Sequence, residues 1–182
     1  VAVINVAPTA VSDEYEAVED TTLTVIDSGV LANDEDAAGD LVALLAVLSE
    51  GPANGTLTFN SDGTFTYVPD LNFFGTDTFT YTISDGEGGT SEPGVVTIVV
   101  VPVNDAPIFA LEGEVAVNED SGTNVIPGIA SAIAAGPDNE SDQKLRFLVS
   151  VDNEALFSEL PRIDADGTLV FATAGNAFGS AT

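Results

Sequence analysis

Val103-Asn104-Asp105-Ala106-Pro107 is a short stretch that occurs twice in this chain. It recurs, nearly unchanged, as Ile4-Asn5-Val6-Ala7-Pro8, ninety-nine positions earlier. A near-identical segment at a domain-sized interval marks the joint between copies of one repeated module. Pro107 has no N–H and favours an extended conformation for the residue before it, so it suits the end of a strand. The spacing therefore predicts two modules of about a hundred residues each.

The composition excludes several classes of protein. The 182 residues carry 3 basic and 30 acidic groups, a net charge of −27 that repels nucleic acid and anionic membranes and attracts divalent cations. Because Cys, His, Met and Trp are all absent, disulfides, thiolate or imidazole zinc sites and Ser–His or Cys–His catalysis are excluded. No apolar run reaches the roughly 18 residues of a membrane helix. We therefore expect neither nucleic acid binding nor membrane insertion.

Glycoside hydrolysis is the enzyme class that this composition leaves open, because it requires only two carboxylates. The chain has no Trp to form a sugar platform, and its acidic residues lie in the repeated loops. Repeated modules usually carry binding surfaces or act as spacers. We therefore expect that the chain is not an enzyme.

Alternating residues predict the strands of the first copy. Residues 56–60 and 64–68 alternate Thr with apolar residues on either side of Asp62-Gly63, a pair that suits the positive φ angles of a tight hairpin turn. Residues 78–83 alternate in the same way and lead through a glycine-rich turn to the apolar run 95–103. About seven short strands in a hundred residues predict an all-β fold, a Greek-key β-sandwich.

The second copy keeps several landmarks of the first. Glu119-Asp120 follows Glu19-Asp20 by 100 positions, and Asp166-Gly167 follows Asp62-Gly63 by 104. The second copy has no counterpart of residues 79–103, and we expect either that a longer chain supplies these strands or that another molecule donates them. We therefore expect the following organisation: residues 1–7 as the end strand of a preceding repeat or a donated strand, residues 8–103 as a complete repeat, and residues 104–182 as a second repeat that lacks its last strands.

Several motifs follow one another in a fixed order: Val18-Glu19-Asp20-Thr21-Thr22, Gly29-Val30-Leu31-Ala32-Asn33-Asp34, Asp62-Gly63-Thr64-Phe65-Thr66-Tyr67, Phe74-Gly75-Thr76-Asp77-Thr78-Phe79 and Ser84-Asp85-Gly86, before Asn104-Asp105-Ala106-Pro107. This series resembles the bacterial Ig-like and cadherin-like (VCBS-type) tandem repeats of large secreted adhesins. The second copy resembles them more weakly, because residues 129–136 are alanine-rich where the family has Leu-Ala-Asn-Asp. The resemblance implies two tandem Ig/cadherin-like sandwiches in a secreted or cell-surface array that is often stiffened by calcium.

Acidic and amide residues gather in loops that a Greek-key module could bring to one end, next to the joint. Calcium takes about six to eight oxygen ligands, usually from several loops, and carboxylates held together without a cation repel one another. A solvated surface loop is the alternative interpretation of each cluster. Together with the resemblance, the clustering predicts calcium ligands at Glu19, Asp20, Asp34, Asp36, Asp40, Asp85, Asn104, Asp105, Glu119, Asp138, Glu140 and Asp142.

The expected function is that of an extracellular structural spacer or adhesive array module in a bacterial surface or matrix protein, with neighbouring repeats as its partners. One alternative is a self-assembling filament subunit, in which residues 1–6 of one molecule supply a strand to the second copy of the next molecule. Another alternative is a carbohydrate- or partner-binding module. An exposed aromatic cluster would support that alternative, and Tyr15, Phe73 and Phe74 are its candidates.

Overall fold

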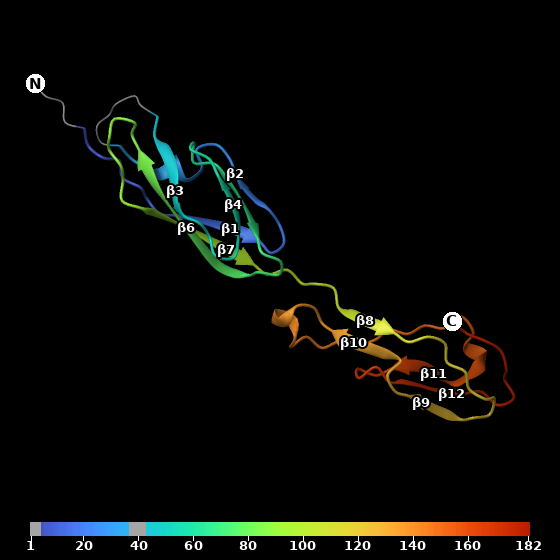
Figure 1. Ribbon diagram of the computed structural model, residues 1–182. Helices are drawn as coiled ribbons and strands as arrows, with labels where there is room; N and C mark the ends of the chain where they lie inside the picture. The colour runs from blue at the N-terminus through green and yellow to red at the C-terminus, as the bar shows by residue number, and fades with distance from the viewer. Residues whose placement is uncertain (1–4, 37–42) are drawn as a thin grey trace, which may run out of the picture. The chain divides into compact units, whose positions relative to one another are not determined.

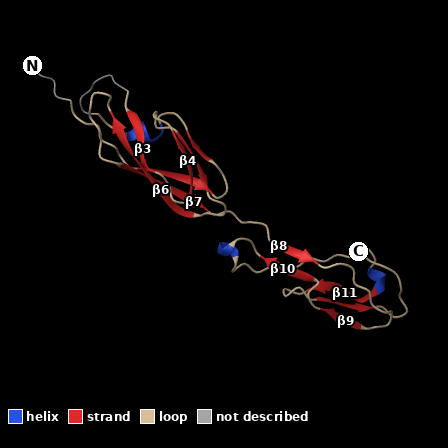
Figure 2. Ribbon diagram, in the orientation of Figure 1, coloured by secondary structure: helices blue, strands red, loops and turns tan. Residues whose placement is uncertain are grey.

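The computed structural model describes residues 5–36 and 43–182, and the chain divides into two compact units, Val1–Val103 (unit 1) and Asn104–Thr182 (unit 2). Figures 1 and 2 show strands and loops in both units. Helical structure in the described ranges is limited to three short 3-10 turns: η1 (Gly29–Asn33), η2 (Asp138–Glu140) and η3 (Glu154–Leu156). None of these is long and apolar enough to cross a membrane. The predicted all-β class is confirmed.

Unit 1 contains two sheets, one with the strand order β1-β7-β6-β3 and one with the order β2-β5-β4 (Figure 1). The strands are β1 (Asp13–Val18), β2 (Leu23–Val25), β3 (Leu45–Glu50), β4 (Gly55–Phe59), β5 (Phe65–Pro69), β6 (Gly75–Ser84) and β7 (Gly94–Val101). β1 pairs parallel with β7, and the other neighbours pair antiparallel. β6 and β7 are therefore the two central strands of the larger sheet.

The core of unit 1 lies between these sheets, because successive side chains of a strand point to opposite faces. The buried residues of β5, β6 and β7 that form it are Phe65, Tyr67, Phe79, Tyr81, Ile83, Val96, Ile98 and Val100. Phe65 packs edge-on against Phe79 with ring centroids 5.2 Å apart. The predicted apolar face of β4 and β5 is confirmed, since Leu57 and Phe59 also pack against this core.

The turn between β4 and β5 differs from the predicted one. Gly63 has a φ of +85°, but Asp62 has no positive φ. Asn60 N–H donates to Thr64 O (2.9 Å) and Gly63 N–H donates to Asn60 O (3.1 Å), so the loop has three residues and ends in a left-handed glycine. The Asp62 carboxylate accepts a hydrogen bond from Thr64 N–H (3.0 Å). The prediction of positive φ angles at both residues was therefore wrong at Asp62.

Unit 2 contains a three-stranded sheet, β11-β12-β9, and a two-stranded sheet, β10-β8. Its strands are β8 (Ile108–Leu111), β9 (Thr123–Ile126), β10 (Ala130–Ala134), β11 (Phe157–Ile163) and β12 (Leu169–Thr173). The apolar residues that it buries are mostly small: Ala130, Ala135, Val170, Phe171 and Ala172. In contrast, Phe178 is 85 % exposed and Leu148 is 83 % exposed. Unit 2 therefore has a much smaller core than unit 1.

Local geometry that occurs in unit 1 recurs in unit 2. Asp20 (φ +55°) accepts a hydrogen bond from Asn72 N–H at 2.8 Å, and Asp120 (φ +57°) accepts one from Asn176 N–H at 2.8 Å. Gly167 ends the β11–β12 hairpin with a φ of +84°, as Gly63 ends the β4–β5 hairpin. The predicted equivalence of these two hairpins is confirmed.

Candidate calcium-binding residues

Glu19 lies immediately after β1 and is only 2 % exposed. Its N–H donates to Val101 O (3.0 Å), and its Oε2 accepts a hydrogen bond from Val103 N–H (2.8 Å). These two bonds hold the carboxylate against the end of β7. Its Oε1 is buried and has no hydrogen-bond partner among the described residues. Burying such an acceptor costs free energy unless water or a cation contacts it.

Asp105 and Glu140 contact each other in unit 2. Glu140 is 5 % exposed, and its Oε1 accepts a hydrogen bond from Asp105 N–H (2.9 Å). Glu140 Oε2 and Asp105 Oδ2 are both buried and without a hydrogen-bond partner in the described part of the chain. Gly136 makes room for both residues, because a Cβ there would lie 2.2 Å from Glu140 Oε2 and 3.2 Å from Asp105 Cβ. Unit 2 thus holds two neighbouring carboxylates that each have one unused, buried oxygen.

Three other predicted ligands lie close to this pair in the sequence: Asn104, Asp138 and Asp142. Asn104 Oδ1 accepts a hydrogen bond from Gln143 Nε2 (3.0 Å), which links the joint sequence to the residues after η2. Asp138 begins η2, and both Asp138 and Asp142 are exposed. Their carboxylates are in the same loop as Glu140 but remain in solvent.

Asp34 belongs to a different group, the Tyr81 cluster. The Tyr81 hydroxyl lies within 3.3 Å of five acceptor oxygens: Val11 O, Val30 O, Asp13 Oδ2 and both carboxylate oxygens of Asp34. A hydroxyl has only one hydrogen to donate. Burial raises the pKa of Asp13 to about 6 and also raises the pKa of Asp34. Burial and the two carboxylates raise the pKa of Tyr81. The carboxyl groups of the cluster therefore release their protons at a higher pH than exposed carboxyl groups do.

Asp85 stabilises its own turn. It is fully buried, its Oδ1 accepts hydrogen bonds from Glu87 N–H (2.8 Å) and Gly89 N–H (2.9 Å), and its Oδ2 accepts one from Asn5 Nδ2 (2.8 Å). The hydrogen bond from Asn5, together with the backbone bonds, lowers the pKa of Asp85. Both carboxylate oxygens are in use, as is typical of an Asp that closes a turn.

The predicted ligands of unit 1 do not converge at one end. Because β6 and β7 are antiparallel, Asp85, which follows β6, lies at the start of β7, whereas Glu19 lies at the end of β7. Asp20 is exposed and its carboxylate accepts a hydrogen bond from Asn72 N–H, and Asp36 is half-buried. In unit 2, Glu119 is exposed. Asp40 lies outside the described residues. Strand direction separates these loops, and the spacing of the acidic residues in the sequence does not reveal strand direction.

Two structurally important carboxylates were missed. Asp13 lies within β1, and Asp77 lies within β6 and is 3 % exposed. Asp77 accepts hydrogen bonds from Ala53 N–H (3.0 Å), Asn54 N–H (2.8 Å) and Tyr67 Oη (2.9 Å). Burial raises the pKa of Asp77, but these hydrogen bonds outweigh it and lower the pKa overall. Strand alternation places Asp77 on the same inward face as Phe79. The burial of Asp77 could have been predicted from this alternation.

Known proteins are similar to this chain in both sequence and fold. "Integrin beta-like protein B" of Dictyostelium discoideum is 25 % identical over 115 residues, which make up 58 % of this chain and only 6 % of that protein. Human protocadherin-24 EC1-2 (Form II) matches with a TM-score of 0.52 and 19 % identity over 92 % of this chain and 78 % of that chain. An endo-fucoidan hydrolase of glycoside hydrolase family 107 matches with a TM-score of 0.41 and 18 % identity over 93 % of this chain and 25 % of that chain.

A family model gives the most direct match. The model of the bacterial cadherin-like domain matches residues 5–102, more than half of the 182 residues. The matched range falls within unit 1. The resemblance inferred from the ordered motifs is confirmed, and the chain belongs to the bacterial cadherin-like domain family.

Proposed function

We propose that this chain is part of an extracellular structural spacer or adhesive array of a bacterial surface or matrix protein, and that calcium stiffens its units. Membership in the cadherin-like family supports an adhesion or structural role. The observation that carries the calcium proposal is the set of buried carboxylate oxygens without hydrogen-bond partners in the described residues: Glu19 Oε1, Asp105 Oδ2 and Glu140 Oε2. The role proposed is binding and mechanical support, not catalysis.

The chemistry of these residues suits calcium. Calcium prefers hard oxygen ligands and accepts both carboxylates and carbonyls in flexible geometry. Glu19 would supply one ligand in unit 1, with Asp20 next to it in sequence; backbone carbonyls or water would have to supply most of the others, because the described residues contain no group of three acidic side chains that could hold a metal ion. Asp105 and Glu140 would form a separate site in unit 2, with Asn104, Asp138 and Asp142 in the surrounding loops.

The remaining predicted ligands are less suited to this role. Asp85 already uses both oxygens to close its turn, and the Asp34 carboxylate contacts the Tyr81 hydroxyl and Val11 N–H. A cation at either residue would have to displace these bonds. We therefore restrict the proposed ligands to two groups. The group in unit 1 is Glu19 and Asp20, and the group in unit 2 is Asn104, Asp105, Asp138, Glu140 and Asp142.

Thermal unfolding with calcium and with a chelator, at matched ionic strength, tests this function. A ligand that binds only the folded state stabilises it by about 2.7 kcal/mol at a concentration 100 times its Kd. We expect a higher midpoint with calcium for the unmodified chain, and a smaller calcium response for Glu19→Gln and Glu140→Gln. Glu92→Gln is the control, because Glu92 is exposed in the loop before β7. Equal midpoints with calcium and chelator would contradict the proposal.

The aromatic candidates for a carbohydrate platform do not form an exposed cluster. Tyr15 packs edge-on against Phe65 with ring centroids 5.1 Å apart, and Phe73 packs against the core of unit 1. Phe74 is the most accessible of the three candidates, at 45 % exposure. These positions favour the spacer or adhesive array over a carbohydrate-binding module.

A further inference from the structure

The Tyr81 hydroxyl joins three segments of unit 1 that are far apart in the sequence. Tyr81 itself lies in β6 and is fully buried. Two of the oxygens around its hydroxyl belong to residues 9–13, the β1 entry segment, and three belong to residues 30–35, the η1 loop. The distances from the hydroxyl are 3.1 Å to Val11 O, 3.3 Å to Asp13 Oδ2, 3.1 Å to Val30 O, and 3.1 and 3.0 Å to the two carboxylate oxygens of Asp34. The two segments therefore meet at one buried oxygen of β6.

The β1 entry segment is attached to the η1 loop by single hydrogen bonds rather than by a strand ladder. Thr9 and Glu35 form an isolated bridge, in which Thr9 N–H donates to Glu35 O (2.8 Å) and Glu35 N–H donates to Thr9 O (3.2 Å). Val11 N–H donates to Asp34 Oδ1 (2.7 Å). The Asp34 carboxylate also contacts the Tyr81 hydroxyl, so the attachment depends on the hydrogen bonds around that hydroxyl.

The oxygens around the Tyr81 hydroxyl outnumber the hydrogens between them. All five are acceptors when Asp13 and Asp34 are ionised, and the hydroxyl donates one hydrogen. Acceptors that face each other in a buried site without a hydrogen between them cost free energy. A protonated Asp13 would donate its O–H to Tyr81 Oη, while Tyr81 donates to another oxygen. One proton on Asp13 thus supplies a second hydrogen at this site.

Unit 1 has no basic side chain that could neutralise these carboxylates. The three basic residues of the chain all lie in unit 2: Lys144, Arg146 and Arg162. Two carboxylates that share a partly buried site repel each other, which favours the neutral form of one of them. Burial is the main cause of the raised pKa of Asp13, and the charge of Asp34 raises it further.

The other groups around the hydroxyl do not offset the two carboxylates. Tyr15 of β1 stays neutral, because burial and the charges of the two carboxylates raise its pKa. Gly94 of β7 and Phe59 of β4 pack against the Tyr81 ring and carry no charge. Glu35 is exposed and contacts the β1 entry segment through its backbone. The two carboxylates themselves therefore set the charge at this site.

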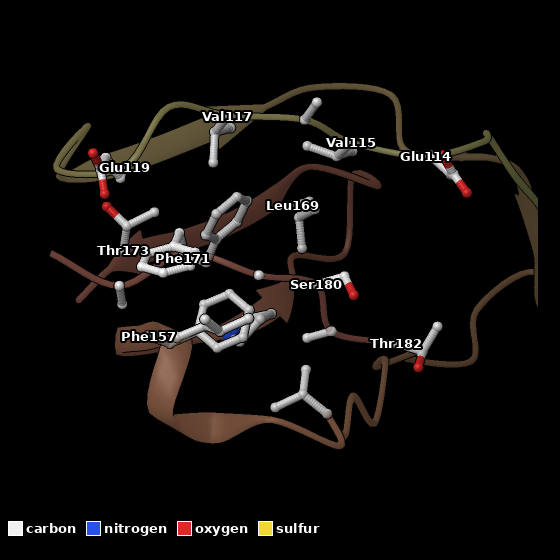
Figure 3. A pocket seen from close by; sticks show the side chains of 18 of the residues that line it. Glu114, Val115, Val117, Glu119, Phe157, Leu169, Phe171, Thr173, Ser180 and Thr182 are labelled. Atoms are coloured by element: carbon white, nitrogen blue, oxygen red, sulfur yellow. The ribbon is translucent and has the colours of Figure 1, made fainter. Parts of the chain in front are cut away.

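Unit 2 has no such pair at the corresponding positions. Alignment of the repeated Glu-Asp pairs places Gly113 and Ala134 at the positions of the two aspartates. The acidic residues that line the cavity of unit 2, Glu114 and Glu119, lie apart from each other (Figure 3). The paired carboxylates around a buried hydroxyl are therefore a property of unit 1.

We propose that a proton on Asp13 acts as a latch, which completes the hydrogen bonding of the Tyr81 hydroxyl and holds the β1 entry segment against the η1 loop. Burial raises the pKa of Asp13 from 3.8 to about 6 in the closed form, whereas opening the segment exposes the carboxyl group to solvent. The closed form is therefore favoured most below pH 3.8, and this preference is lost as the pH rises through about 6. The latch uses none of the proposed calcium ligands and goes beyond the spacer role.

Amide exchange of the full chain, resolved by NMR with a chelator present at pH 4 and pH 7, tests the latch. Protection factors, which remove the intrinsic pH dependence of exchange, would be compared for Val11 and Glu35, because both N–H groups donate across the latch. We expect both protection factors to fall by at least about tenfold between pH 4 and pH 7. Asn54 N–H is the control, because it donates to Asp77, whose pKa is lowered, and its protection should not fall.

Asp13→Asn replaces the titrating group with an amide that donates hydrogens at every pH. It should remove the fall in protection at Val11 and Glu35, whereas Glu14→Gln, a change at an exposed neighbour in β1, should keep it. Protection at Asn54 shows that each variant is folded. Equal protection of Val11 and Glu35 at the two pH values in the unmodified chain would overturn the proposal, and so would a fall that persists in Asp13→Asn.

Discussion

Asp13→Asn should stabilise unit 1 at neutral pH and have little effect in acid. Burial raises the pKa of Asp13 from 3.8 to about 6, so the folded state favours its neutral form. The stability from this group is complete below pH 3.8 and is lost as the pH rises through about 6. One pKa unit corresponds to about 1.4 kcal/mol, and partial solvent exposure reduces the effect. We therefore expect a gain of about 1–2 kcal/mol at pH 7.5.

Tyrosine emission is a selective assay for this prediction, because Tyr15, Tyr67 and Tyr81 all lie in unit 1. Urea unfolding followed by tyrosine emission would be compared at pH 3.5 and pH 7.5. Glu14→Gln is the matched control, because Glu14 neighbours Asp13 in β1 and is exposed. A loss of stability at pH 7.5, or the same gain at both pH values, would contradict a raised pKa of Asp13 in the folded state.

Two further substitutions test the packing of unit 1 by the same tyrosine assay. Gly63→Val should destabilise it by at least about 1–2 kcal/mol, because Gly63 has a φ of +85° and a Cβ there would lie 2.5 Å from Ser28 O. Gly51→Val, where a Cβ meets no atom within 4 Å, is the control, and equal effects would contradict the turn geometry. Tyr67→Phe should cost about 1–3 kcal/mol, because it removes the hydroxyl that donates to buried Asp77. No change in stability would show that this hydrogen bond is dispensable.

The strands of the sandwich could be predicted from the sequence. In a strand that is buried on one face, apolar and polar side chains alternate at every second residue, and this pattern is visible in the sequence itself. Thr56 and Thr58 face outward, while Phe65 and Tyr67 are buried, as the pattern indicated. The repeated Asp-Gly pairs likewise predicted two equivalent hairpins. The three-residue form of the loop was not predicted, because Ser61 extends the turn without any signal in the Asp-Gly pair.

The grouping of the candidate calcium ligands could not be predicted from the sequence, because it depends on strand direction. Loop composition alone could not show that Glu19 and Asp85 lie at opposite ends of β7. It also gave no means of recognising Asp13, which lies in a strand, is half-buried and contacts the Tyr81 hydroxyl. The unpartnered oxygens of Asp105 and Glu140 depend on the small size of Gly136, and only the folded arrangement reveals that contact.

Equilibrium dialysis in 150 mM KCl would measure how many calcium ions the chain binds, and salt at this concentration screens nonspecific attraction to the net charge of −27. We expect saturable binding that Glu19→Gln and Glu140→Gln each weaken at a different site, while Glu92→Gln leaves it unchanged. Saturable binding that neither substitution alters, or no saturable binding at all, would contradict the proposed calcium ligands.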